Sequence, residues 1–113
     1  MEEFIKDIER FFEENSFERN GNIWSRNGVA HTSGQVIVVN GVRQEIPGQP
    51  IQIEQLFEVI GECELMNEQD EVEAKYMHCS LDIKQNGESM GEMCQLFSTP
   101  QECIDLVKQI FRI

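Results

Sequence analysis

The chain has 113 residues, 40% of them hydrophobic, which is the size and composition of one globular domain. Its formal net charge at pH 7 is −12, from 21 acidic residues against 9 lysines and arginines. A field of that sign repels nucleic-acid phosphates and anionic lipid, so we expect no direct binding to nucleic acid or to a membrane. The apolar runs are short and no secretion signal is recognisable, which predicts a cytoplasmic protein.

The N-terminal segment predicts an amphipathic helix. Its apolar residues recur at the spacing of one helix face, namely Phe4, Ile5, Ile8, Phe11 and Phe12. The remaining positions are mostly charged, so we expect this helix to pack on the rest of the domain through that single stripe.

Four Asn-Gly pairs follow, and Asn-Gly favours the type I′ turn of a two-residue hairpin. We predict one hairpin at Asn40-Gly41, between strands over 36–39 and 42–46, and another at Asn86-Gly87, between strands over 76–84 and 90–97. The two earlier pairs, Asn20-Gly21 and Asn27-Gly28, divide residues 17–32 into short pieces and predict a meander there.

The segment after the Pro47-Gly48-Gln49-Pro50 break fits two structures. Ile53, Leu56, Phe57 and Ile60 have helical spacing, whereas alternate residues from Phe57 to Leu65 are apolar or small and fit a strand. We favour a short helix over 53–60 followed by a strand, because Pro50 precedes the pattern and Gly61 stands where a helix commonly ends. A strand throughout is the alternative.

Further along, apolar residues occupy even positions from 72 to 76 and odd positions from 77 to 83. This change of phase near Tyr76 predicts a β-bulge or a strand that passes between sheets.

The C-terminal segment predicts a second helix. Thr99 as N-cap, Pro100 at the first helical position and Glu102 two residues later form a capping box, and apolar residues then recur at helical spacing from Cys103 to Phe111.

The order of elements predicts an α+β fold. We expect a single domain over 1–113, with one mostly antiparallel sheet of about five or six strands and with the N- and C-terminal helices packed on one face. This order resembles that of small acidic chaperones of bacterial secretion systems, a likeness of architecture without a shared motif.

Motifs for metal, cofactor or catalytic chemistry are missing. His31, His78 and the four cysteines, Cys63, Cys79, Cys94 and Cys103, lack the spacing of zinc ligands. Cys63, Cys79 and Cys94 could meet across adjacent strands, but we interpret all four cysteines as reduced thiols that mostly pack in the core. We expect the single tryptophan, Trp24, to pack in the core as well. No nucleotide-binding, hydrolase or metalloprotease motif occurs either. We therefore expect a non-enzymatic protein without a cofactor.

One segment stands out by its charge. From Gln44 to Ala74 there is no lysine or arginine but nine acids. The plain interpretation is a solvated surface; the functional one is a docking surface, since acidic patches speed association with basic proteins and favour them over other partners. The residues that we predict to bind a partner are Glu58, Glu62, Glu64, Glu68, Asp70, Glu71 and Glu73.

The leading hypothesis is therefore an acidic protein-binding module, such as an inhibitor, an immunity or anti-defence factor or a chaperone-like protein, that docks on a basic partner and in one version mimics nucleic acid. The alternative is a small-molecule-binding or enzymatic domain with a pocket between the sheet and the helices, near Trp24, Tyr76, His78 or the cysteines. A homodimer formed through a free strand edge is a further alternative.

Overall fold

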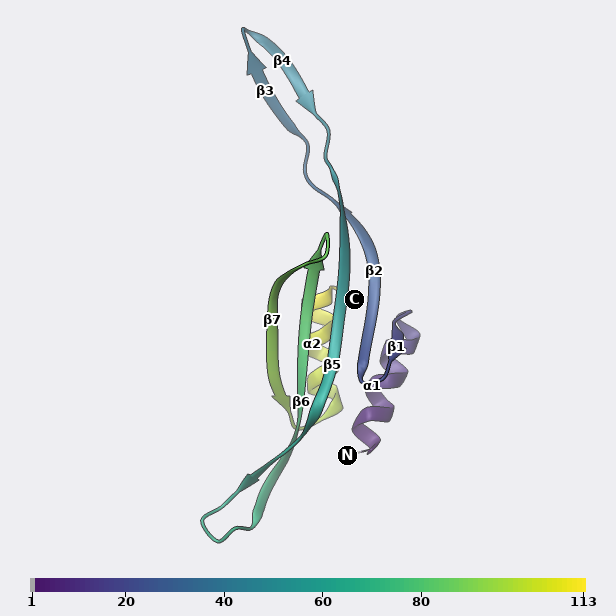
Figure 1. The fold of residues 1–113 in the computed structure, drawn as a ribbon, viewed down its shortest axis with the longest axis vertical. Coiled ribbons are helices and arrows are strands. Elements are labelled where there is room, and N and C mark those ends of the chain that lie inside the picture. Colours follow the sequence, from purple (N-terminus) through teal and green to yellow (C-terminus); the bar gives the residue numbers. More distant parts are fainter. Residues whose placement is uncertain (1) are drawn as a thin grey trace.

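The computed structural model describes residues 2–113, which form an elongated α+β structure of 75 × 31 × 21 Å (Figure 1). The two helices stand at the ends of the sequence, as predicted, with seven strands between them over the described residues. In chain order the elements are α1 (Glu2–Glu14), β1 (Glu18–Asn20), β2 (Ile23–His31), β3 (Gln35–Val39), β4 (Val42–Ile46), β5 (Pro50–Met66), β6 (Val72–Gln85), β7 (Glu88–Phe97) and α2 (Pro100–Phe111).

Five of these strands make the main sheet, in the order β1-β2-β5-β6-β7, and every neighbouring pair is antiparallel. Strands β3 and β4 form a separate two-stranded hairpin. The predicted sheet of five or six strands is thus a sheet of five, and the hairpin at Asn40-Gly41 stands outside it.

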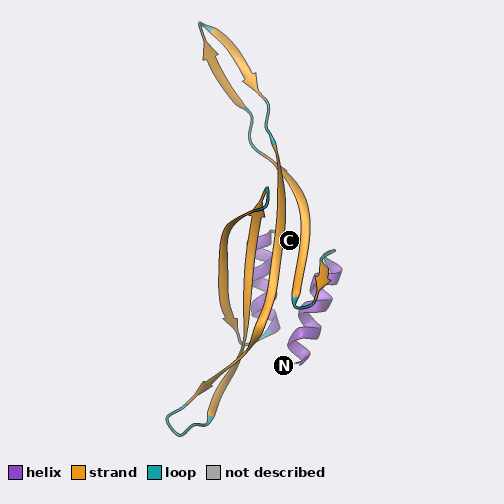
Figure 2. Cartoon of the chain, viewed as in Figure 1, coloured by secondary structure: helices purple, strands orange, loops and turns teal. Residues whose placement is uncertain are grey.

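Both helices lie on the same face of the main sheet, as the sequence predicts (Figure 2). Their apolar stripes meet the inward side chains of β2, β5, β6 and β7. Phe12 lies at the centre, with ring centroids 4.8 Å from Phe17, 4.9 Å from Phe57 and 5.6 Å from Trp24. Packing on one face leaves the opposite face of the sheet uncovered by any helix of the described residues.

Two of the Asn-Gly predictions are confirmed. Asn40 and Gly41 have φ of 52° and 76°, and Asn86 and Gly87 have φ of 50° and 85°, which are the positive angles that a type I′ turn requires. Asn20-Gly21 also lies at a turn, between β1 and β2.

The prediction that Asn27-Gly28 divides this region into two short strands of a meander is wrong. Both residues lie inside β2, where Asn27 pairs with Glu54 and Gly28 with Ile53. The long neighbouring strand β5 continues the ladder past them, so tertiary pairing overrides the local turn preference.

The prediction of a helix over 53–60 is also wrong, because β5 is one unbroken strand. Its apolar residues mimic helical spacing because they are divided between both faces of the sheet: Phe57 and Val59 are buried beneath the helices, while Ile60 is exposed. Gly61 does not end a helix; it follows a register shift between Val59 and Gly61 in the pairing with β6.

The change of phase near Tyr76 has a simpler cause than a bulge at that residue. The pairing of β6 with β5 is regular from Ala74 to His78 on the β6 side. The helices cover β6 only from Met77 onward, so the apolar positions before and after that point belong to opposite faces. Met77 is 2% exposed, whereas Tyr76 is half-buried on the other face.

The start of α2 confirms the predicted cap. The backbone N–H of Glu102 donates to Oγ1 of Thr99 at 3.2 Å. The Glu102 carboxylate accepts from the Ser98 hydroxyl at 2.9 Å and from the Ser98 backbone N–H at 3.1 Å. Cys103 follows in the core with no exposed surface.

Neither of the two described helices has both the length and the apolar character needed to cross a membrane.

Candidate functional site

Strands β5 and β6 are longer than the strands beside them, so their far ends project from the sheet (Figure 1). β2 accompanies β5 as far as Glu58, and β7 accompanies β6 from Met77 onward. Residues 63–76 therefore form a two-stranded ribbon with a turn at its tip, and Gly61 and Glu62 lead into it opposite His78 and Met77. We call residues 61–76 the acidic arm.

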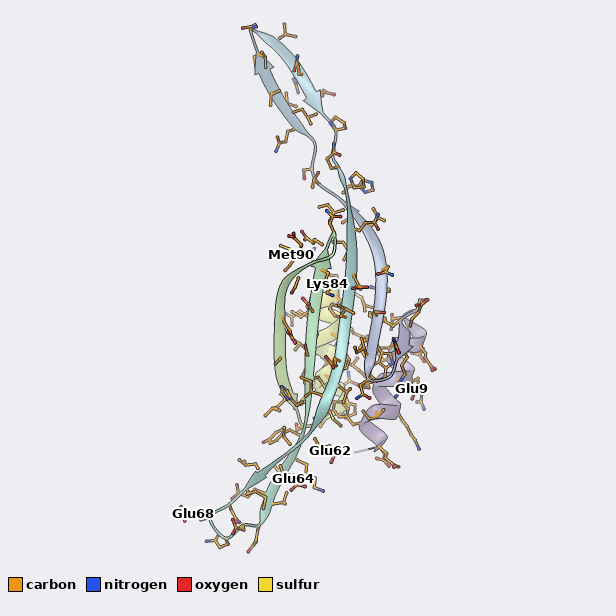
Figure 3. The ribbon with its side chains drawn as sticks, viewed as in Figure 1. Glu9, Glu62, Glu64, Glu68, Lys84 and Met90 are labelled. Carbon is orange, nitrogen blue, oxygen red and sulfur yellow. The ribbon has the colours of Figure 1, made fainter. Side chains whose placement is uncertain are left out.

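The acidic arm brings together six of the seven predicted partner-binding residues. Figure 3 shows Glu62, Glu64 and Glu68 along it, and the turn and the start of β6 add the other three. All seven predicted residues are exposed. Glu58 is set apart, on the uncovered face of the main sheet, where it pairs with Ser80 of β6 and Ile23 of β2. The six on the arm are Glu62, Glu64, Glu68, Asp70, Glu71 and Glu73.

Asn67 orders the tip of the arm. Its side-chain Oδ1 accepts hydrogen bonds from the backbone N–H groups of Gln69 and Glu71, both at 2.9 Å. Its own backbone N–H donates to the Glu71 carbonyl at 2.9 Å, and Asp70 takes a left-handed conformation with φ of 59°. Asparagine suits such a turn because its short amide bonds to nearby backbone. The acids of the tip therefore stand on a defined loop.

The electrostatics of the arm are strongly one-sided. Six acids and one lysine give residues 61–76 a formal charge of −5. The lysine, Lys75, lies 3.9 Å from the Glu64 carboxylate, and both side chains are about half exposed to solvent. A pair of this kind contributes little, about 0–1 kcal/mol, and leaves the net charge unchanged.

Exposed apolar side chains stand among the acids. Leu65, Met66 and Val72 are 49%, 45% and 45% exposed. Met66 pairs with Val72, so these two side chains share one face near the tip, whereas Leu65, one residue earlier, lies with Ala74 on the other face. Sequence reasoning missed these residues because they read as ordinary interior positions of a strand; their exposure follows from the absence of a third strand beside the described arm.

The cysteines and histidines do not assemble into a site. Cys79 faces the helices, where it contacts Cys103, and both are fully buried. Cys63 and Cys94 instead pair with Tyr76 and Ser80, four residues apart on β6, or about 13 Å along a strand. The expected meeting of Cys63, Cys79 and Cys94 thus does not occur.

Cys103 is also poorly suited to act as a nucleophile. A hydrogen bond with the Cys79 thiol, together with burial, raises the pKa of Cys103 far above its ordinary value. The thiol therefore stays protonated, and a protonated thiol is a poor nucleophile. Within residues 2–113, no three His, Cys, Asp or Glu side chains are grouped closely enough to hold a metal ion.

The space between sheet and helices, where the alternative hypothesis places a pocket, is filled by core side chains that include Trp24. Tyr76 and His78 lie on the opposite face, next to residues exposed there. A surface groove of ≈ 380 Å³ does run between the two helices, lined by Asp7, Arg10 and Glu14 from one and by Pro100, Gln101 and Ile104 from the other. None of the residues suggested for a pocket lines this groove.

Comparison with known proteins adds no family: no protein-family model matches the chain, and searches of curated proteins and of solved structures find no match.

Proposed function

We propose that the protein is a non-catalytic binding module that docks on a basic protein through its acidic arm. The observation that carries the proposal is the projection of the arm: it holds six of the predicted acids, and those from Glu64 onward lie past the ends of both β2 and β7. Acids that served solubility alone would need no such concentration at one end of the molecule.

The composition of the arm supports contact with a protein. Interfaces typically have an apolar centre and a polar rim. Leu65, Met66 and Val72 supply exposed apolar surface at the tip, and the carboxylates around them supply charge. The acids would raise the rate of encounter with a lysine- and arginine-rich surface, and the apolar side chains would slow dissociation once the arm is seated.

The order of the tip also favours binding. Because Asn67 holds the turn through two side-chain hydrogen bonds, the loop loses less conformational freedom on docking than a loose loop would. The uncovered sheet face continues from the arm through Ile60 and Glu58, so a larger partner has adjoining surface to contact.

The proposal is tested by capturing partners from the native host with wild-type protein and with a charge-reversed variant. The variant carries Glu62→Lys, Glu64→Lys, Asp70→Lys and Glu71→Lys. We expect wild type to retain a basic protein that moderate salt releases, and the variant to retain at least tenfold less, since repulsion replaces attraction at four positions.

A matched control makes the same change of charge elsewhere, with Glu13→Lys, Glu14→Lys, Glu18→Lys and Glu88→Lys, all at exposed positions. It should capture the partner as wild type does. Circular dichroism and thermal melting show whether each variant is folded. If the folded arm variant retains the partner fully, or if both variants lose it equally, the acidic arm is not the docking surface.

A further inference from the structure

The β3–β4 hairpin, residues 35–46, forms a second projection at the end of the molecule opposite the acidic arm (Figure 1). We call these residues the apolar arm. Six of its twelve residues are aliphatic, and each is between 38% and 69% exposed: Val36, Ile37, Val38, Val39, Val42 and Ile46. An isolated two-stranded hairpin is marginally stable in water, and a strand pair this apolar is unusual on a free surface. We therefore expect another protein surface to cover the exposed aliphatic side chains of this arm.

The pairing of the two strands divides the side chains between two unlike faces. Val39 pairs with Val42, Ile37 with Gln44, and Gln35 with Ile46, and partners in a ladder point to the same side. This face holds four aliphatic residues, two glutamines and no charge. The opposite face carries both charged residues of the arm, Arg43 beside Val38 and Glu45 beside Val36.

We propose that the uncharged face of the apolar arm is the contact between two copies of this chain. A twofold contact brings a patch against itself, so the patch has to be self-complementary. An uncharged aliphatic face meets that condition, whereas any face rich in carboxylates would repel its own copy. Joining two hairpins face to face also provides the additional strands that a lone hairpin lacks.

The distribution of charge in the whole chain points to the same occupant. A protein with a net charge of −12 is repelled by its own copy over most of its surface, and the apolar arm, with one arginine and one glutamate, is neutral. If the two hairpins pack in opposite directions, contact at this end directs the two acidic arms outward to opposite ends of the dimer. Their separation then far exceeds the screening length of about 8 Å at physiological salt.

The size of the patch sets the expected strength. Two strands of five residues cover about 17 Å by 10 Å, which is less than the roughly 800 Å² per partner of a standard interface. We therefore expect a weak dimer with a dissociation constant of about 100 μM, and sedimentation equilibrium should show a concentration-dependent rise from monomer to dimer mass.

The test compares two single substitutions within the same hairpin. Val42→Glu places a charge on the proposed contact face, and Val38→Glu places one on the opposite face, beside Arg43. The two valines are 60% and 69% exposed, so either change should have a similar small effect on folding, checked by thermal melting. We expect wild type and Val38→Glu to dimerise alike, and Val42→Glu to weaken dimerisation at least tenfold.

Three outcomes would overturn the proposal. The wild-type protein could stay monomeric at several hundred micromolar, which would mean that something other than a second copy covers the apolar arm. Dimerisation could also be unaffected by Val42→Glu, or it could be weakened equally in both variants. The test needs no partner protein and leaves the acidic arm intact. Its result is thus separate from that of the proposed docking function.

Discussion

Ser98, Thr99 and Glu102 show how single side chains set the start of α2. Thr99 caps the backbone at the helix N-terminus, and the Glu102 carboxylate accepts two hydrogen bonds from Ser98. Removing the cap hydroxyl with Thr99→Ala should lower the free energy of unfolding by about 1 kcal/mol. Because α2 supplies Cys103, Val107 and Phe111 to the core, weakening the start of this helix should lower the stability of the whole fold.

The same cap predicts a dependence on pH. The hydrogen bond from the Ser98 hydroxyl, followed by that from the Ser98 backbone, holds the pKa of Glu102 below its ordinary value. A pKa lowered by folding gives stability that is present above the unfolded-state pKa, about 4.3 for glutamate, and is lost as the pH falls through the folded-state value. Glu102→Gln should therefore lower stability at neutral pH and reduce the loss of stability on acidification.

This is measured as the urea midpoint between neutral pH and about pH 3, a range that spans the ordinary glutamate pKa. Glu18→Gln, which removes an exposed carboxylate on β1, is the control and should follow the wild-type curve in shape. Parallel curves for wild type and Glu102→Gln would show that the Ser98 contacts contribute nothing.

At the scale of elements, the base of the apolar arm depends on a glycine. Where the chain leaves β2 and re-enters β5, the Thr32 backbone N–H donates to the Gln49 carbonyl at 2.9 Å, and the Gln49 N–H donates to Oγ1 of Thr32 at 2.8 Å. The two segments approach so closely that a Cβ at Gly48 would collide with the Thr32 carbonyl oxygen. The arm is thus attached through a tight crossing.

Gly48→Ala should accordingly force the two segments apart. We expect a loss of about 1–3 kcal/mol, as for other overpacked sites, and amide exchange at Thr32 at least tenfold faster than in wild type. Gly28→Ala is the matched control, because a Cβ at that strand position meets nothing within 4 Å, and it should change stability by no more than about 0.5 kcal/mol. Unchanged exchange at Thr32 in Gly48→Ala would contradict this account of the crossing.

The elements also differ in how far their sequence predicts them. Both helices and the hairpins at Asn40-Gly41 and Asn86-Gly87 follow from local signals, namely one apolar stripe, a capping box and turn residues. The strand β5 does not, because Phe57 and Val59 face the core while Leu56 and Ile60 lie on the uncovered face, and together they imitate helical spacing. A pattern read along one strand does not reveal which of its faces a helix will cover.

The candidate site, too, is predicted only in part by the sequence. The acids of the arm are visible in the sequence as a run without lysine or arginine, and the structure brings six of them onto one ribbon. Glu58 falls outside it, and the exposure of Leu65, Met66 and Val72 is not foreseen. Both results depend on where β2 and β7 end. The sequence of the arm does not reveal where these neighbouring strands end, so neither result can be predicted from it.

At the scale of the whole molecule, two projections of opposite character stand at the two ends of a structure 75 Å long. One is acidic and ordered by Asn67; the other is neutral and aliphatic. The main sheet, with both helices packed on one face, lies between the two projections and keeps them apart. We infer that the acidic arm binds a basic protein and that the apolar arm binds a second copy of the chain. The dimer would then present two acidic arms to its partners.

The most direct test of docking through the acidic arm is the association rate constant with the captured partner, measured against ionic strength. Steered association is fast at low salt and falls steeply as salt screens the charges. We predict a steep fall for wild type and for the Glu13, Glu14, Glu18 and Glu88 control, and a slow, nearly flat profile for the variant reversed at Glu62, Glu64, Asp70 and Glu71. Coinciding profiles for wild type and the arm variant would contradict the account.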